Sequence, residues 1–145
     1  MHHLVFKIAC SLAISVLSTS LSAAAGRQMN VKIHCPAIKS SGVNIVTHSG
    51  TYLEGMGTEK INNAEITPPV FKNNITPDSS IPSDLKAAGY HNSGVEYNPI
   101  TGMVMCQYKT WRGHDSFALS SVKNHGVGGV VTRSNKDEIF ISFSA

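Results

Sequence analysis

Two cysteines, Cys35 and Cys106, lie far apart in the sequence and place the strongest single constraint on the fold. A bond between them would close a loop of about 70 residues, which the loop-entropy model values at about 4 kcal/mol. That is comparable with the whole stability of a marginal domain. Whether the bond forms depends on the redox compartment, since disulfides persist outside the cytosol and are rare within it.

The first residues indicate that compartment. MHHLVFK supplies a short basic start, and the apolar run Ile8–Leu21 and small residues follow. These are the parts of a secretory signal peptide, with an N-terminal anchor as the alternative. We expect cleavage after Ala25, with Ala24 as the alternative, so that residues 1–25 are the signal peptide and residues 26–145 a single mature β-domain. Cys10 is removed with the signal peptide, and the two remaining cysteines are expected to form a structural disulfide.

The composition limits the class of partner. The chain has 145 residues, with 12 Lys and Arg against 9 Asp and Glu, and a formal net charge of +3. That excess is too small to favour a nucleic acid or a membrane surface. No second apolar run of spanning length is present in the sequence, so no stable membrane insertion is expected after cleavage. We therefore expect a periplasmic or secreted protein.

Short segments of alternating polarity, separated by turn residues, dominate the mature chain. Val43–His48 and Thr51–Glu54 predict a pair of strands, and one edge strand is expected near Val70–Phe71 within a long polar connection. Three further strands are predicted over 117–122, 127–132 and 138–143. Strand–helix alternation and internal repeats are absent, so the predicted class is mainly β, an antiparallel sandwich or barrel-like sheet.

One short helix is predicted over residues 83–89. Ser83 or Asp84 can cap its first turn, and Gly89 can end it. Because it has barely two turns, it must be held by packing against the rest of the domain.

The clearest local prediction is a hairpin that contains Cys106. Its loop is Pro99–Gly102, in which proline opens the turn and glycine closes it with a positive φ. A four-residue loop places Tyr97 opposite Val104 and Val95 opposite Cys106. On the period-two rule these four side chains share one apolar face, so the cysteine points where a structural disulfide belongs.

Residue types used in catalysis are dense in VMCQYKTWRGHDSF, residues 104–117, but their spacing is unsuitable. His114-Asp115-Ser116 are neighbours, and neighbours on an extended chain point to opposite faces and do not converge as a triad. A nucleophilic pair of His34 and Cys35 would need a free thiolate on the cysteine, and a disulfide leaves no thiolate. No catalytic residue is predicted.

No metal or cofactor site is predicted either. The histidines after the signal peptide include no pair at metal-ligand spacing and no H-E-x-x-H motif. A site that forms only in the fold, for example from His91, His114 and Asp115, stays open. Gly126–Gly129 lack the helix and the lysine that follow a phosphate-binding loop, so a bulge or a close strand crossing is expected there.

Trp111, Arg112 and His114 are the candidate ligand-binding residues. An exposed Trp–Arg pair is typical of a protein-binding hot spot. Tryptophan is more often largely buried, so we expect Trp111 to pack over the disulfide with Arg112 in solvent, and an exposed contact surface is the alternative.

The early Cys35-Pro36 and the later Cys106-Gln107-Tyr108 strand after a Pro/Gly turn resemble those of a group of small exported proteins of Gram-negative bacteria that have no established activity. The likeness covers most of residues 31–110 and implies a signal peptide and paired cysteines. Residues 93–97, SGVEY, are also similar to a Ser-Gly-x-x-Tyr stretch of bacterial lysozyme inhibitors, whose remaining pattern is absent here.

These features predict a non-enzymatic exported domain that binds a protein or a component of the cell envelope. Two alternatives stay open: a small envelope hydrolase whose catalytic groups converge only in the fold, and an inhibitor of a lysozyme or a protease. A cleft lined by Glu96, His114 and Asp115 would favour the hydrolase. An exposed surface around Trp111 and Arg112 would favour the binding protein.

Overall fold

Eleven strands and no helix are found in the part of the chain that the structure describes. The computed structural model describes residues 28–39, 47–49, 52–74 and 81–144. The strands are β1 (Gln28–His34), β2 (Thr47–Ser49), β3 (Tyr52–Met56), β4 (Thr58–Ile61), β5 (Ala64–Glu65), β6 (Val70–Asn74), β7 (Tyr90–Tyr97), β8 (Val104–Thr110), β9 (Ser116–Ser121), β10 (Val130–Ser134) and β11 (Glu138–Ser144).

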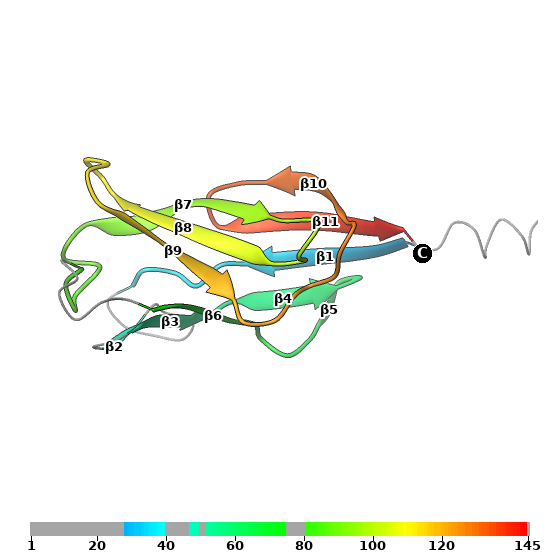
Figure 1. Ribbon diagram of the computed structural model, residues 1–145, viewed down its shortest axis with the longest axis horizontal. Coiled ribbons are helices and arrows are strands. Elements are labelled where there is room, and N and C mark those ends of the chain that lie inside the picture. Colours follow the sequence, from blue (N-terminus) through cyan, green and yellow to red (C-terminus); the bar gives the residue numbers. More distant parts are fainter. Residues whose placement is uncertain (1–27, 40–46, 50–51, 75–80, 145) are drawn as a thin grey trace, which may run out of the picture. The chain divides into compact units, whose positions relative to one another are not determined.

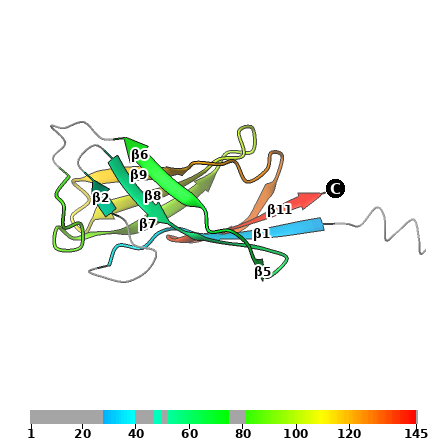
Figure 2. The ribbon, with the colours of Figure 1, turned by 90° about the horizontal axis from the view of Figure 1, so that it is seen from below.

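These strands form two antiparallel sheets. The first sheet has the order β10-β11-β1-β4-β5, and the second has the order β2-β3-β6-β9-β8-β7. Strands β1 and β11, the first and last strands of the described residues, run side by side in both views (Figures 1 and 2). Alternating side chains from the two sheets pack into one buried cluster. The predicted mainly β fold with packed antiparallel sheets is confirmed.

The chain passes from the second sheet to the first at Gly57, the only residue between β3 and β4. A Cβ atom at this position would collide with the backbone carbonyl of His34 and would lie 2.9 Å from the ring of Phe71. Only glycine allows the two backbones to approach so closely at the corner.

The core is apolar and includes one tyrosine without solvent exposure, Tyr108. Its hydroxyl donates to the carbonyl of Pro36 at 2.6 Å, and its ring stacks on Phe117 at 4.9 Å. Asn92 donates to the same carbonyl at 3.0 Å. The polar end of the tyrosine is therefore satisfied inside the core, as burial requires. The buried apolar residues are Val31, Ile33, Cys35, Ile38, Leu53, Phe71, Leu85, Tyr90, Val95, Val104, Cys106, Tyr108, Phe117, Leu119, Ile139, Ile141 and Phe143.

The predicted disulfide is present. Cys35 follows β1 in the first sheet and Cys106 lies in β8 of the second, with a Cα–Cα distance of 5.9 Å, so the bond joins the two sheets through the core. The predicted hairpin register is also confirmed, because Val95 pairs with Cys106 and Tyr97 with Val104. Gly102 closes its loop with a φ of +74°, as expected.

The predicted helix over residues 83–89 is wrong, because this segment forms hydrogen-bonded turns. The predicted end signals are nevertheless used. Asp84 Oδ1 accepts from the Ala87 amide at 3.0 Å, and Gly89 has a φ of +87°. A cap and a left-handed terminator this close together leave room for one turn only, and a helix of that length does not propagate.

The strand near Val70–Phe71 is interior and not an edge, since β6 pairs with both β3 and β9. The long polar connection expected around it begins with the short hairpin β4–β5, whose Asn62 and Asn63 adopt left-handed φ values of 49° and 67°. Asparagine tolerates this conformation, which two-residue hairpin turns require.

Some predictions fall on parts of the chain that the structure does not describe. Residues 1–27 contain the predicted signal peptide, and residues 40–46 contain most of the predicted strand Val43–His48. Of the latter, β2 is seen, paired with β3. No helix within the described ranges is long and apolar enough to cross a membrane.

Alkaline pH should destabilise this core. Burial, the largest cause, raises the pKa of the Tyr108 phenol above its ordinary value of 10.0; the hydrogen bond with Asn92 acts in the opposite direction, and the Asp137 carboxylate adds to the rise. Above about pH 10 the unfolded chain loses this proton and the folded chain keeps it. The free energy of unfolding should then fall by up to about 1.4 kcal/mol per pH unit.

Urea unfolding at a series of pH values from about 8 to 11 measures this slope. Stability from Tyr108 is complete below its unfolded pKa and is lost as the pH rises towards its folded pKa. Tyr108→Phe should be less stable at neutral pH, through the lost bond to Pro36, but should show a shallower alkaline slope. An unchanged slope would show that other groups cause the alkaline loss.

Candidate functional site

The turn between β8 and β9 presents the densest group of chemically active side chains. The amide of Thr110 donates to the Asp115 carbonyl at 3.0 Å, and the amide of Gly113 donates to the Thr110 carbonyl at 2.8 Å. Gly113 has a φ of +71°, which glycine adopts without strain. The turn is therefore closed by its own backbone. Figure 1 shows it in yellow, at the end of β8 where β9 begins.

Trp111 lies on this turn with 76% of its surface exposed. The expectation that it packs over the disulfide is wrong. Tyr108 points into the core and Thr110 ends the strand, so the chain has already turned away from the core when it reaches Trp111. Cys106 is fully buried on the inner face of β8. The exposed alternative is the arrangement found.

Contacts with the second sheet hold the exposed indole in place. It stacks on the imidazole of His91 with the ring centroids 3.7 Å apart and the planes at 13°. His91 belongs to β7 and pairs with Lys109, and its Nδ1 lies 3.4 Å from the Gly89 carbonyl. One face of Trp111 is thus covered by a residue of a regular strand. We call Trp111, His91, Arg112 and His114 the tip surface.

The other two predicted contact residues share this turn. Arg112 and His114 are exposed, and within the described ranges neither side chain has a hydrogen-bond or ion-pair partner. Asp115 is exposed at the base of the turn. Burial and, secondarily, this carboxylate raise the pKa of Tyr90, whose ring packs against Phe117 at 5.1 Å. The tip surface therefore combines an indole with free cationic and imidazole groups over an apolar base.

The cleft named for the hydrolase alternative does not form. Glu96 pairs with Met105, whereas Tyr90 pairs with Thr110, next to the turn that holds His114 and Asp115. Six residues of extended chain separate these positions by roughly 20 Å. Glu96 instead lines a pocket of about 510 Å³ beside the Pro99–Gly102 loop.

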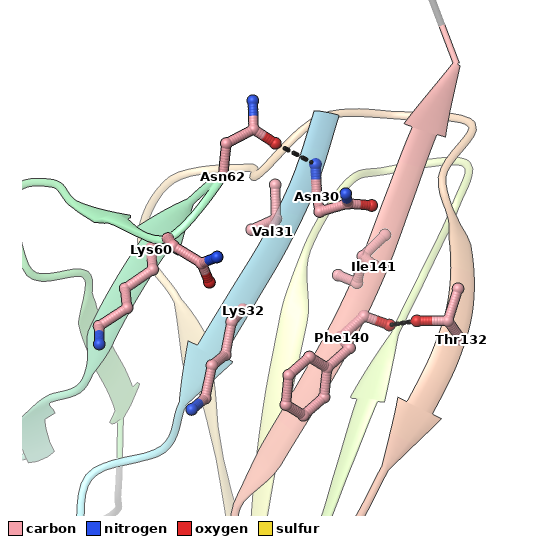
Figure 3. Close-up of a pocket in the computed structure, with 9 residues that line it drawn as sticks. Asn30, Val31, Lys32, Lys60, Asn62, Thr132, Phe140 and Ile141 are labelled. Carbon is pink, nitrogen blue, oxygen red and sulfur yellow. Dashed lines mark hydrogen bonds between the residues drawn. The ribbon is translucent and has the colours of Figure 1, made fainter. Parts of the chain in front are cut away.

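A second pocket, of about 340 Å³, lies on the first sheet (Figure 3). Lys32 of β1 and Lys60 of β4 are directly paired there, and their ammonium groups point towards the same end of the pocket. Phe140 lies beside Lys32, with 5.5 Å from ring centroid to Nζ. Glu138 forms an ion pair with Lys32, so a carboxylate offsets that cation, and Glu65 of β5 is the residue opposite Lys60 in the strand register. The pocket is formed by residues distant in sequence, so no local pattern predicted it.

Two clusters of titratable side chains also escaped prediction. Nδ1 of His125 lies 2.7 Å from Oε1 of Glu59, and the two side chains are only 3% and 9% exposed. This pair is closed to solvent, which suits a structural role.

His34, Asp137 and Glu138 form the other cluster, with one ligand atom from each residue within 4.8 Å of the others. His91, His114 and Asp115 form no such group among the described residues.

Comparisons of this chain with models of protein families, with curated proteins and with solved structures give no significant match.

Proposed function

We propose that this protein is an exported binding protein that captures a protein partner with its tip surface. The observation that supports this is the state of Trp111, which is 76% exposed and yet stacked on His91. A tryptophan held in one orientation at the surface loses little conformational freedom when a partner covers it. Tryptophan and arginine are the residue types most enriched at the energetic centres of protein interfaces.

The size of the indole sets the scale of the interaction. Covering roughly 150 Å² of aromatic surface at about 25 cal/mol/Å² contributes about 4 kcal/mol. Arg112 and His114 are exposed on the same turn as the ring, and within the described ranges neither side chain has a hydrogen-bond or ion-pair partner. The surface best fits a partner with an apolar pocket for the indole and carboxylates at the rim of that pocket.

Export is the second part of the proposal. The apolar run and small residues at the start of the sequence support cleavage after Ala25 and a periplasmic or secreted location. The disulfide between Cys35 and Cys106 suits an oxidising compartment. The proposal includes an envelope protein, a lysozyme or a protease as partner, and it requires no catalytic group in this chain.

The test is capture of the partner from periplasmic extract and medium by oxidised residues 26–145, followed by affinity measurement with the purified partner. Trp111→Ala should weaken binding about 30-fold or more, which corresponds to about 2 kcal/mol. The fold should be unchanged in circular dichroism, because Trp111 lies outside the core. Lysozyme and protease inhibition assays show whether the partner is such an enzyme.

Ile100→Ala is the matched control. Ile100 is 85% exposed and lies in the Pro99–Gly102 loop, at the other end of the β7–β8 hairpin. The substitution Ile100→Ala removes a large exposed apolar side chain, as Trp111→Ala does, and should leave the affinity for the partner unchanged. Equal effects of Ile100→Ala and Trp111→Ala would contradict a role specific to the tip surface.

A further inference from the structure

The cluster of His34, Asp137 and Glu138 has the ligand types of a transition-metal site. His34 ends β1, Asp137 lies in the turn before β11, and Glu138 is the first residue of β11, so the group offers one imidazole nitrogen and two carboxylates. Zn²⁺ binds such nitrogen and oxygen ligands at about 2.0–2.2 Å, so the edge of a tetrahedral site is roughly 3.4 Å. Nε2 of His34 lies 3.5 Å from Oδ2 of Asp137, which is close to this spacing.

A hydrogen bond orients the imidazole for this role. Nδ1 of His34 lies 2.8 Å from the carbonyl oxygen of Cys35, so Nδ1 must carry the hydrogen. In the neutral ring, Nε2 then presents its lone pair to the Asp137 carboxylate. Two acceptors that face each other need a cation or a proton between them. A backbone carbonyl bonded to the other ring nitrogen is also the usual outer-shell partner of a metal-ligating histidine.

The two carboxylates are held on a rigid scaffold. Oδ1 of Asn135 accepts from the amides of Asp137 at 3.1 Å and Glu138 at 2.8 Å, which fixes the turn before β11. The amide of Cys35 donates to the Asp137 carbonyl at 2.8 Å, and the disulfide anchors Cys35 to the second sheet. The backbone that carries the three side chains is therefore held by hydrogen bonds and by the disulfide.

Lys32 is the cation now beside the cluster. Its Nζ lies 3.1 Å from Oε2 of Glu138, an ion-pair contact without hydrogen-bond geometry, and that oxygen is closed to solvent. A carboxylate oxygen without a directed donor is poorly satisfied. The charged groups at the site are thus two carboxylates and one ammonium, which leaves a net negative charge before a metal ion binds.

We propose that His34, Asp137 and Glu138 bind one Zn²⁺ ion, with water completing the coordination. This site is separate from the tip surface, and it departs from the expectation of no metal drawn from spacing in the sequence. The ion would cross-link β1 to β11 close to the disulfide.

Titration of ZnCl₂ into oxidised residues 26–145, stripped with EDTA and desalted, tests the proposal by calorimetry. We expect saturable one-to-one binding. His34→Gln and Asp137→Asn should each weaken zinc binding by about 100-fold. Loss of an outer-shell partner typically weakens metal binding about 10- to 100-fold, and each of these variants loses a direct ligand. Lys32→Met should tighten it about tenfold, because the competing cation is removed.

His114→Gln is the matched control, since it removes an exposed imidazole outside the cluster. It should leave the zinc affinity unchanged.

No saturable binding, or binding that survives both His34→Gln and Asp137→Asn, would overturn the proposal. Equal affinity for Ca²⁺ would overturn the nitrogen-ligated assignment, because Ca²⁺ prefers oxygen ligands. Circular dichroism and thiol labelling check that each variant is folded and oxidised. Asp137 lies on a turn and is only partly buried, so Asp137→Asn should leave the fold intact.

Discussion

Replacing His125 with leucine is expected to lower the free energy of unfolding by about 3–5 kcal/mol. The side chain of Glu59 is 9% exposed, and Nδ1 of His125 lies 2.7 Å from its Oε1 as a hydrogen-bond partner. Leucine has a similar volume, so the cavity created is small. The loss comes from a carboxylate left inside the protein without its partner. Urea unfolding at neutral pH measures the change.

The double variant Glu59→Leu/His125→Leu separates the charge from the packing. Two apolar residues of similar volume remove both polar groups together, so the double variant should regain most of the stability that His125→Leu loses. A double variant as unstable as His125→Leu would show that the position of the imidazole, and not the unpaired carboxylate, sets the cost.

The Glu59–His125 pair also fixes the connection between β9 and β10, which crosses from one sheet to the other. The amide of His125 donates to the Gly102 carbonyl at 2.7 Å, and the Tyr97 hydroxyl donates to the Gly126 carbonyl at 2.6 Å. The amide of Gly129 donates to the same hydroxyl at 3.1 Å. His125→Leu should therefore raise hydrogen exchange in this connection before the rest of the domain.

Removing the disulfide should have an effect of the same size. The double variant Cys35→Ala/Cys106→Ala is expected to lose about 4 kcal/mol, because the unfolded chain is no longer constrained by a closed loop of about 70 residues. Alanine is chosen because both sulfurs are buried, and serine would add an unsatisfied hydroxyl. Urea unfolding of the oxidised protein and of the double variant compares the two directly.

Reduction of the unaltered protein provides the control. The oxidised protein should show no reactive thiol until a reductant is added, and the reduced protein should match the double variant in stability. Immediate thiol labelling would contradict a formed bond. A stable double variant would show that the two sheets are held by packing alone.

Local patterns in the sequence predicted the features that depend on neighbours along the chain. Alternating polarity in residues 138–143 predicted β11, and the Pro99–Gly102 loop predicted the register that brings Val95 opposite Cys106. Both follow from a strand period of two and from the φ preferences of proline and glycine. The two cysteines predicted the bond that joins the sheets.

Features that depend on packing between distant segments were not predicted. The strand β6 became interior because β9, which lies far along the chain, pairs with it. The predicted helix over 83–89 was wrong because a segment this short can form either a helical turn or other closed turns. Its length and the packing around it decide between them. Glu59 contacts His125, and His34 contacts Asp137, although many residues separate the partners in the sequence. No sequence motif links either pair.

The tip surface shows the same division within a few residues. The sequence by itself determined that Trp111, Arg112 and His114 follow a strand and share a turn, since these are properties of adjacent positions. Only the tertiary structure decided that the indole is exposed and stacked on His91. The physical reason is that burial is a property of the whole packed domain. The side chain of Trp111 lies outside once the core is filled by Tyr108, Phe117 and their neighbours.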